Sequence, residues 1–183
     1  NSDDAHAIGV SGTPGRGRIE TAGLENQDGP LRLVTFGKAL GSAGAANVGG
    51  ADRIAQHAET ARPYIYTTAL PPAQVAATRE AVRIARAGDG LRERLHANIE
   101  RLKSGARARG LRLMASETPI QPLLVGDDAE ALSMAAALET QGYWVAAIRP
   151  PTVPEGGARL RITLGAAHDT QQVEGLLDAL SHA

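Results

Sequence analysis

Apolar residues recur every three to four positions through the middle of the chain, which predicts helices with one buried face. Pro71-Pro72 indicates the start of the first of these helices, because proline is tolerated in the first turn, and the helix extends to about Arg86. Its expected buried face consists of Val75, Ala76, Ala77, Val82 and Ile84. Gly88 and Gly90 end this helix. The expected buried face of the second helix consists of Leu91, Leu95, Ile99, Leu102 and Ala106.

Charged residues occupy the other side of the second helix, and Gly110 is expected at the C′ position after its last turn. The charged positions are Arg92, Glu93, Arg94, Glu100, Arg101 and Lys103. A charge run of this kind is most simply a solvated face.

Strand-like and helical patterns alternate from Leu111 onward. Strands are predicted at 120–125, 143–148 and 159–164, and in the last of these Leu160 and Ile162 face one side while Arg159 and Arg161 face the other. Asp127 or Asp128 is expected to cap a helix that runs to about Thr140 and stops at Gly142. The last helix carries an apolar stripe of Val173, Leu176, Leu177 and Leu180. These elements predict a small α/β unit with helices on one sheet face.

The first part of the chain has a different pattern. Residues 31–35 (LRLVT) predict a strand buried on both faces, and residues 11–30 predict a loop with a short helix around Ile19. A short helix is expected at 51–60 and a short strand at 65–67. We place a domain boundary within the second long helix, which divides the chain into residues 1–100 and 101–183.

Composition restricts the function classes. The chain has 183 residues, with 19 Lys plus Arg, 20 Asp plus Glu and no cysteine. The near-zero net charge gives no support to nucleic-acid binding, and disulfides and thiolate metal sites are excluded. No apolar stretch is long enough for a membrane span and no secretory signal is visible, so a cytoplasmic protein is the default. The chain begins without an initiator methionine, and we expect it to be the C-terminal half of a longer protein.

Lys38 stands on a small-residue turn directly after the predicted strand at 31–35. Gly37 and Gly41 allow the backbone to turn sharply or approach a ligand. At the end of a buried strand a lysine can be desolvated, which lowers its pKa and frees the amine to attack a carbonyl. The alternative is a surface lysine on a glycine-rich loop.

Asp3 and His6 form a second candidate group, three residues apart before a glycine-bearing turn. Pyridoxal phosphate needs a lysine, a carboxylate that keeps its pyridine nitrogen protonated, and a hydrogen-bond donor near its phenolic oxygen. Asp3, His6 and Lys38 supply these three types. No pair of histidines has convincing metal-ligand spacing, and no metal site is expected.

Together, Asp3-x-x-His6 and Thr35-Phe36-Gly37-Lys38 resemble the α-oxoamine synthases, pyridoxal-phosphate enzymes of the aspartate-aminotransferase-like group. The resemblance implies an α/β fold of type I, of which this chain would contain the end of the large mixed-sheet domain, the linking helices and the small C-terminal domain. It also implies that Thr35 contacts the cofactor phosphate. Asp4 would not meet the pyridine nitrogen, because neighbouring strand residues point to opposite faces.

Residues 65–72 (IYTTALPP) are similar to the family segment before the interdomain helix. There, hydroxyl residues reach the cofactor phosphate of the neighbouring subunit, a role that would fall to Thr67 and Thr68 in a homodimer with its active site at the interface. The simpler alternative is that both threonines satisfy backbone groups before the helix.

Residues 148–154 (IRPPTVP) and 158–164 (ARLRITL) extend the resemblance to the small domain. Arg161 matches the family arginine that binds the α-carboxylate of the amino acid, which suits a guanidinium fork. Its alternative is a solvent-facing strand position. Thr152 matches a substrate-contacting threonine, and Arg149 lies beside it.

The stretch at 148–154 is most similar to the branch of the family that works in biotin biosynthesis. That branch joins L-alanine to a pimeloyl thioester, carried by coenzyme A or a carrier protein, to form 8-amino-7-oxononanoate. Two alternatives remain: a related activity such as that of 2-amino-3-ketobutyrate ligase, which uses glycine, or a non-catalytic fragment. The chain alone is expected to be inactive.

Overall fold

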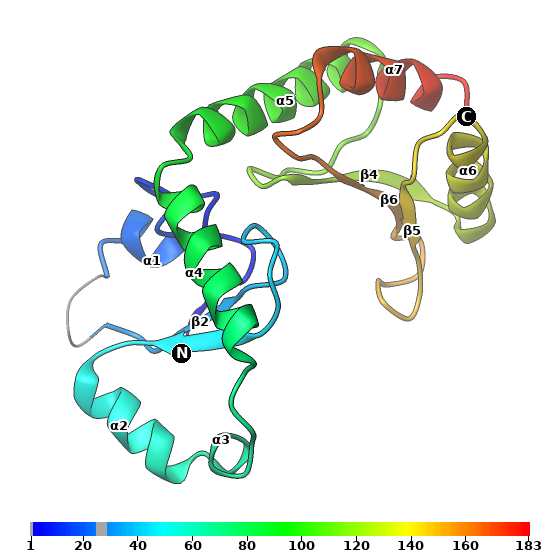
Figure 1. The fold of residues 1–183 in the computed structure, drawn as a ribbon. Helices are drawn as coiled ribbons and strands as arrows, with labels where there is room; N and C mark the ends of the chain where they lie inside the picture. The colour runs from blue at the N-terminus through cyan, green and yellow to red at the C-terminus, as the bar shows by residue number, and fades with distance from the viewer. Residues whose placement is uncertain (1, 25–28) are drawn as a thin grey trace. The chain divides into compact units, whose positions relative to one another are not determined.

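The computed structural model describes residues 2–24 and 29–183 (Figure 1). Residues 25–28, inside the predicted 11–30 loop, lie outside the described residues. The chain divides into two compact units, Asn1–Arg92 and Glu93–Ala183. The division falls within the helix in which the sequence places the domain boundary.

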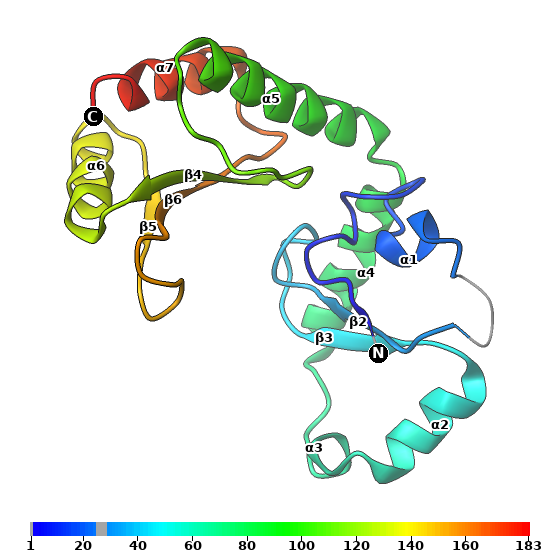
Figure 2. The same ribbon diagram turned by 180° about the vertical axis from the view of Figure 1, so that it is seen from behind.

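The first unit contains a three-stranded mixed sheet with short helices around it (Figure 2). Its elements are β1 (Ser2–Asp3), α1 (Arg18–Thr21), β2 (Arg32–Thr35), β3 (Ala45–Val48), α2 (Ala51–Thr60), α3 (Arg62–Ile65) and α4 (Pro72–Arg86). β2 is the central strand, parallel to β1 and antiparallel to β3. The predicted helix at 51–60 and the helix start at Pro72 are confirmed.

Burial in the first unit is lower than predicted. In β2, Val34 is 7% exposed but Leu33 is 38% exposed, so the strand is buried on one face only. The expected buried face of α4 is also wrong, because Val75, Val82 and Ile84 are 52%, 39% and 48% exposed. Periodicity locates an apolar stripe, but it does not show whether the covering element belongs to the same chain.

The half-buried side of α4 includes polar side chains. Thr78 Oγ1 lies 2.7 Å from Ser42 Oγ, and Gln74 Nε2 donates to the same Ser42 oxygen at 2.6 Å. The strand predicted at 65–67 is wrong as well, since α3 ends at Ile65 and a turn follows. Pro63 explains the difference, because its fixed φ is preorganised for the first turn of a helix.

The second unit is an antiparallel sheet with helices packed on it. Its elements are most of α5 (Asp89–Ala108), β4 (Ile120–Gly126), α6 (Asp128–Thr140), β5 (Ala146–Ile148), β6 (Ala158–Thr163) and α7 (Thr170–Leu180). The strand order is β4-β6-β5, and α6 contacts all three strands. Figure 1 and Figure 2 both show α7 beside α5. Gly105 permits this approach, because a Cβ there would collide with Leu177.

Sequence signals in the second unit agree closely with its structure. Leu160 and Ile162 are buried while Arg161 is exposed, which confirms the predicted alternation in β6. Of the two candidate caps, Asp127 is the N-cap of α6, and its carboxylate accepts a hydrogen bond from the Glu130 N–H. The expected apolar stripe of α7 is buried throughout.

The end of α5 also agrees with the prediction. Gly110 has a φ of +69°, its N–H donates to the Arg107 carbonyl at 3.2 Å, and the Leu111 N–H donates to the Ala106 carbonyl at 2.9 Å. These two bonds form a Schellman motif with Gly110 at C′. One charged position was assigned wrongly, since Arg92 is 9% exposed rather than solvated. Its guanidinium donates to the Ala85 carbonyl and pairs with Asp89 across the junction of α4 and α5.

Candidate active site

The pairing of β1 with β2 places two groups of predicted site residues at one sheet edge. The strands are parallel, with Asp3 opposite Leu33, so their carboxyl ends meet at the same edge. Asp3 ends β1, and Thr35 ends β2. The turns that carry His6 and Lys38 leave from these two ends.

A compact turn follows β1 and carries His6. The Asp4 carbonyl accepts hydrogen bonds from the N–H groups of Ala7 at 2.9 Å and Ile8 at 3.0 Å. Asp3 Oδ1 accepts from the Ala5 N–H at 2.8 Å. Asp3 and His6 are both exposed, so both side chains are accessible to a ligand at this edge.

The turn after β2 carries Lys38 and is closed by backbone hydrogen bonds. The Ser42 N–H donates to the Phe36 carbonyl at 2.8 Å, and the Gly41 N–H donates to the Lys38 carbonyl at 2.9 Å. Gly41 has a φ of +56°, which suits glycine. The Lys38 side chain is exposed, so the described residues do not supply the buried surroundings expected for it.

The two turns touch each other through Gly9. A Cβ at Gly9, whose φ is +79°, would lie only 3.1 Å from the Cβ of Ala39, the neighbour of Lys38. The Gly9 N–H also donates to the Gly15 carbonyl at 2.8 Å, which holds the following loop against the same place. The structure therefore brings the Asp3 and His6 turn and the Lys38 turn together.

The Thr35 hydroxyl at this edge has an unsatisfied hydrogen-bonding capacity within the part of the chain that the structure describes. Its Oγ1 is buried and has no hydrogen-bond partner among the described residues. A buried hydroxyl without a partner is costly, and such groups commonly have a functional explanation. A phosphate oxygen would accept from this hydroxyl, and the polar groups of Thr35, Lys38, Asp3 and His6 fit pyridoxal phosphate.

Only two lysines occur in the chain, Lys38 and Lys103, and their surroundings differ. Lys103 Nζ donates to Glu117 at 2.9 Å and to Glu100 at 3.2 Å. The hydrogen bond to Glu117 raises the pKa of Lys103 above its ordinary value of 10.5. Lys103 is engaged by two carboxylates, whereas Lys38 stands on the turn beside Asp3 and His6, so Lys38 is the better candidate for attack on a carbonyl.

Thr67 and Thr68 lie in the first unit, on the exposed segment between α3 and α4. The N-cap of α4 is Pro71, without a side-chain cap. Neither threonine makes a side-chain hydrogen bond within the described part of the chain, so the alternative in which they satisfy backbone groups before the helix is not supported. Both hydroxyls are available to a ligand.

The remaining predicted site residues lie in the second unit. Arg161 is on the exposed face of β6, the central strand, opposite Pro122 and Ala146. The Thr152 N–H donates to the Arg149 carbonyl at 3.1 Å, so these two residues share one turn. The three side chains are exposed.

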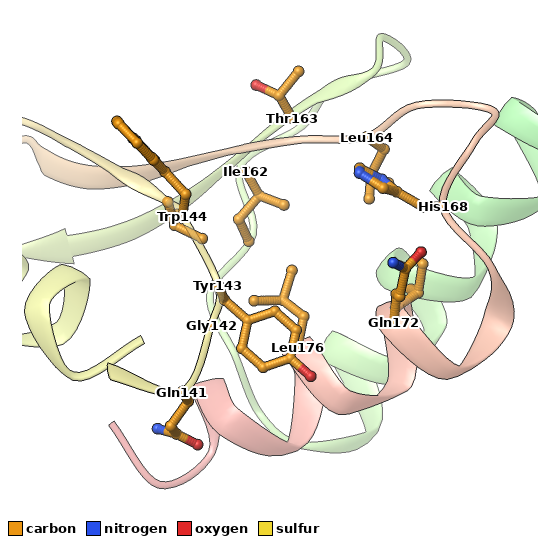
Figure 3. Close-up of a pocket in the computed structure, with 12 residues that line it drawn as sticks. Gln141, Gly142, Tyr143, Trp144, Ile162, Thr163, Leu164, His168, Gln172 and Leu176 are labelled. Atoms are coloured by element: carbon orange, nitrogen blue, oxygen red, sulfur yellow. The ribbon is translucent and has the colours of Figure 1, made fainter. Parts of the chain in front are cut away.

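A pocket in the second unit was not predicted from the sequence. It has a volume of about 440 Å³ and lies between residues 141–145, the end of β6 and α7. Figure 3 shows Trp144 and His168 on opposite sides of it, with Ile162 and Leu176 between them. Trp144 is 90% exposed, and His168 accepts a hydrogen bond from the Gly165 N–H through Nδ1. Two adjacent aromatic residues at the start of a short strand-like run, Tyr143 and Trp144, give no sequence signal for such a pocket.

Two negative findings apply to the residues that the structure describes. None of their helices is long and apolar enough to cross a membrane. No cluster of three or more His, Asp or Glu side chains among them could hold a metal ion.

Residues 2–180 match the family model of aminotransferase class I and II, and the chain belongs to this family. It is 60% identical over 182 residues to 8-amino-7-oxononanoate synthase of Xanthomonas oryzae pv. oryzae and 60% identical over 181 residues to that of Xanthomonas campestris pv. campestris. Each alignment covers 99% of the chain and 45% of the relative. The chain thus spans about half the length of the curated relatives it matches.

Solved structures of the same fold confirm the α/β class predicted from the sequence. Serine palmitoyltransferase of Sphingomonas wittichii superposes with a TM-score of 0.92 at 32% identity, covering 98% of this chain and 45% of that one. 8-Amino-7-oxononanoate synthase of Francisella tularensis gives a TM-score of 0.89 at 28% identity, with coverages of 98% and 53%. A structure of SPT that contains a PLP internal aldimine gives 0.92 at 33% identity, with coverages of 98% and 46%. The neighbours therefore include proteins that hold pyridoxal phosphate (PLP).

Proposed function

We propose that the protein containing this chain is a PLP-dependent acyltransferase that condenses L-alanine with a pimeloyl thioester. Carbon dioxide and the thiol carrier would be released, and 8-amino-7-oxononanoate of biotin biosynthesis would be formed. The observation that carries this proposal is the shared sheet edge, where parallel β1 and β2 bring Asp3 and His6 beside Thr35 and Lys38. The 60% identity to the Xanthomonas synthases supports the choice of substrates.

Lys38 is the proposed attachment point and proton-transfer group. When bound, PLP supplies an electron sink for the electron pair freed as the α-proton of alanine leaves. Lys38 would accept that proton after the amino group of alanine has displaced the lysine amine from the cofactor. Asp3, at the end of β1, would hold a proton on the pyridine nitrogen, which is the task of a carboxylate in such sites.

Hydrogen-bonding groups would complete the site. His6 would donate to the phenolic oxygen, and Thr35 Oγ1, which is buried and unpartnered in the described chain, would donate to the phosphate. Thr67 and Thr68 would donate to the phosphate of a neighbouring subunit, which makes a homodimer part of the proposal. Their exposure between α3 and α4 is consistent with that role.

Residues of the second unit would hold the amino acid. The guanidinium of Arg161 can bind a carboxylate with two parallel hydrogen bonds. Thr152 would contact the substrate beside it, and Arg149 shares its turn. These three side chains would therefore orient alanine rather than take part in proton transfer.

A related activity is the second candidate, and backbone similarity alone does not separate the two. The TM-score with serine palmitoyltransferase, 0.92, is no lower than the 0.89 with an 8-amino-7-oxononanoate synthase. Among the solved structures, sequence identity does not separate them either, at 28% with that synthase and 32% with the palmitoyltransferase. The 60% identity to the Xanthomonas synthases is what favours alanine over serine.

The test uses the whole protein, or a chimera in which this chain replaces the 182 aligned residues of the Xanthomonas oryzae synthase. Alanine, glycine and serine are each supplied with pimeloyl-CoA or a pimeloyl carrier protein, and products are identified by mass spectrometry. The expected product is 8-amino-7-oxononanoate from alanine with either carrier. A product from glycine or serine alone would assign the protein to another α-oxoamine synthase activity. No product from any pair, with PLP bound, would refute the acyltransferase assignment.

A further inference from the structure

The carboxylate of Asp4 is completely buried, although Asp4 has no part in the proposed chemistry. Its Oδ1 accepts a hydrogen bond from the Arg18 N–H at 3.3 Å, and its Oδ2 lies 3.4 Å from Nε of Arg32. Replacing a buried ion pair with apolar residues is often neutral or stabilising. The burial of this ion pair is therefore weak evidence that Asp4 serves stability alone. The contacts of Asp4 indicate a second role, in positioning neighbouring residues.

The main chain of Asp4 connects the elements that carry the proposed site. Its N–H donates to the Leu33 carbonyl of β2 at 3.0 Å, and its carbonyl accepts from Ala7 and Ile8. The turn closed by these last two bonds contains His6. Asp3 is the preceding residue and points to the opposite face of β1. The main chain of Asp4 is thus held in place between Asp3 and His6, the two residues predicted to contact the cofactor ring.

The side chain of Asp4 also fixes the loop that reaches the Lys38 turn. Gly17 has a φ of +91°, and a Cβ there would collide with Asp4 Oδ2, so the loop backbone lies directly against the carboxylate. Arg32 Nη1 donates to the Arg16 carbonyl at 2.9 Å and holds the same loop from the other side.

That loop continues the contacts toward Lys38. The Gly15 carbonyl accepts from the Gly9 N–H at 2.8 Å, and Gly9 in turn faces Ala39. Gly15 also lies close to Gly9, since a Cβ at Gly15 would be 3.2 Å from the Gly9 Cα. A continuous set of close contacts therefore leads from the Asp4 carboxylate to the residue after Lys38.

We propose that Asp4 is a positioning residue of the cofactor site. Its buried carboxylate, held between Arg32 and the Arg18 N–H, fixes the turn that bears Asp3 and His6 against the turn that bears Lys38. This inference rests on the proposed function and adds to it a residue that touches neither cofactor nor substrate. Asparagine at position 4 keeps an oxygen for the Arg18 N–H but loses the charge that holds Arg32, so the two turns would lose their mutual orientation.

The experiment compares the whole wild-type protein with Asp4→Asn and with Glu20→Gln as a matched control. Glu20 lies in α1, directly after this loop, and its Oε2 accepts from the Thr13 N–H at 3.1 Å, whereas the polar partners of the Asp4 carboxylate are Arg18 and Arg32. Three quantities are measured: the dissociation constant for added PLP, the visible circular dichroism per bound cofactor, and the thermal unfolding midpoint. Visible circular dichroism reports the orientation of the bound ring, which a purely structural role of Asp4 would not change.

Asp4→Asn should raise the dissociation constant by at least about tenfold and alter the visible circular dichroism, because small misplacements of reacting groups are costly. Glu20→Gln should change neither quantity. The proposal is overturned if Asp4→Asn lowers the unfolding midpoint but leaves the dissociation constant and the visible signal at wild-type values.

If Asp4→Asn does not fold, Arg32→Lys takes its place, since it keeps the positive charge and removes the guanidinium from Asp4 and Arg16. It should change the same two quantities in the same direction, and wild-type values would overturn the proposal. A wild-type protein that does not bind PLP would instead refute the proposed function, and this inference with it.

Discussion

Ser42 Oγ and Thr78 Oγ1 lie 2.7 Å apart, which connects the turn after Lys38 directly to α4. Ser42 also accepts from Gln74 one helical turn earlier, and Thr78 Oγ1 donates back to the Gln74 carbonyl at 2.9 Å. These hydrogen bonds among Ser42, Gln74 and Thr78, here called the polar seam, hold α4 against the Lys38 turn. The large apolar residues Val75, Val82 and Ile84 of α4 are exposed and take no part in this attachment.

Thr78→Val should remove the two hydrogen bonds of the Thr78 hydroxyl with little change of shape, and it leaves the bond from Gln74 to Ser42 in place. Valine has the same branched outline but no hydroxyl, and a lost intramolecular hydrogen bond costs about 1 kcal/mol of unfolding free energy. Chemical denaturation of the whole protein measures the change, with Thr78→Ser as the variant that keeps the hydroxyl. Equal stability of the valine and serine variants would show that the Thr78 hydroxyl contributes nothing to the stability.

Lys38→Ala should abolish the covalent attachment of PLP and lower kcat by at least about a hundredfold, because proton transfer by a positioned group is lost. Borohydride reduction followed by peptide mass spectrometry locates the attachment in wild type. Lys103→Gln is the matched control, since it removes the other lysine of this chain and should leave attachment and turnover intact. A reduced cofactor found on Lys103 would contradict the assignment.

Substitutions of Asp3 should mainly lower turnover at saturating PLP, whereas substitutions of Asp4 should mainly lower stability. Asp3 is exposed and Asp4 is 0% exposed beside Arg32, so Asp4→Ala should lower the unfolding free energy by about 3 kcal/mol while Asp3→Ala changes it little. Asp3→Asn should lose most of its turnover, and Asp4→Asn should lose less at saturating PLP. Greater loss of turnover in Asp4→Asn would mean that the register of the Asp-x-x-His motif is off by one.

The sequence predicts best those elements whose partners lie within the chain. The stripe of α7 is buried against its own unit, and Gly110 and Asp127 end and begin helices as their residue types predict. Patterns fail where the partner is not among the described residues. Val75 and Val82 lie seven residues apart on one side of α4 and remain exposed, and Leu33 lies on a strand face without cover.

The candidate site was only partly predictable for a related reason. Asp3, His6, Thr35 and Lys38 were located by motif, and the parallel pairing of β1 and β2 then placed them at one edge. The buried state of the neighbouring Asp4 could not be read from its type, because its partner Arg32 lies 28 positions further along the chain and meets it only through the sheet.

Asp169→Ala should weaken α7 at its first turn. Asp169 Oδ1 accepts from the Gln172 N–H at 2.8 Å, and the Gln172 side chain accepts from the Asp169 N–H at 2.9 Å, which together form a capping box. Loss of such a cap costs about 1 kcal/mol of unfolding free energy. Gln171 is exposed and lies two residues after Asp169 in the first turn of α7, so Gln171→Ala should leave the unfolding free energy unchanged. Equal losses of unfolding free energy in both variants would rule out the cap as the cause.

Residues 93–183 should fold alone, whereas residues 1–92 should not. The second unit has a core of large apolar side chains, including Leu102, Leu138, Leu160 and Leu177, each 0% exposed. The buried apolar residues of the first unit are fewer and smaller, and it exposes Leu33, Val48, Tyr66, Val75 and Ile84.

An uncovered sheet face and helix stripe favour association with another chain over a stable monomer. Size-exclusion chromatography and thermal unfolding of the two separate pieces measure the difference. Residues 93–183 should give a monomer with one cooperative transition, and residues 1–92 should aggregate or unfold without cooperativity. A monomeric, cooperatively folded 1–92 piece would mean that its exposed apolar residues need no covering partner, and that the sheet edge carrying Asp3 and Lys38 is stable by itself.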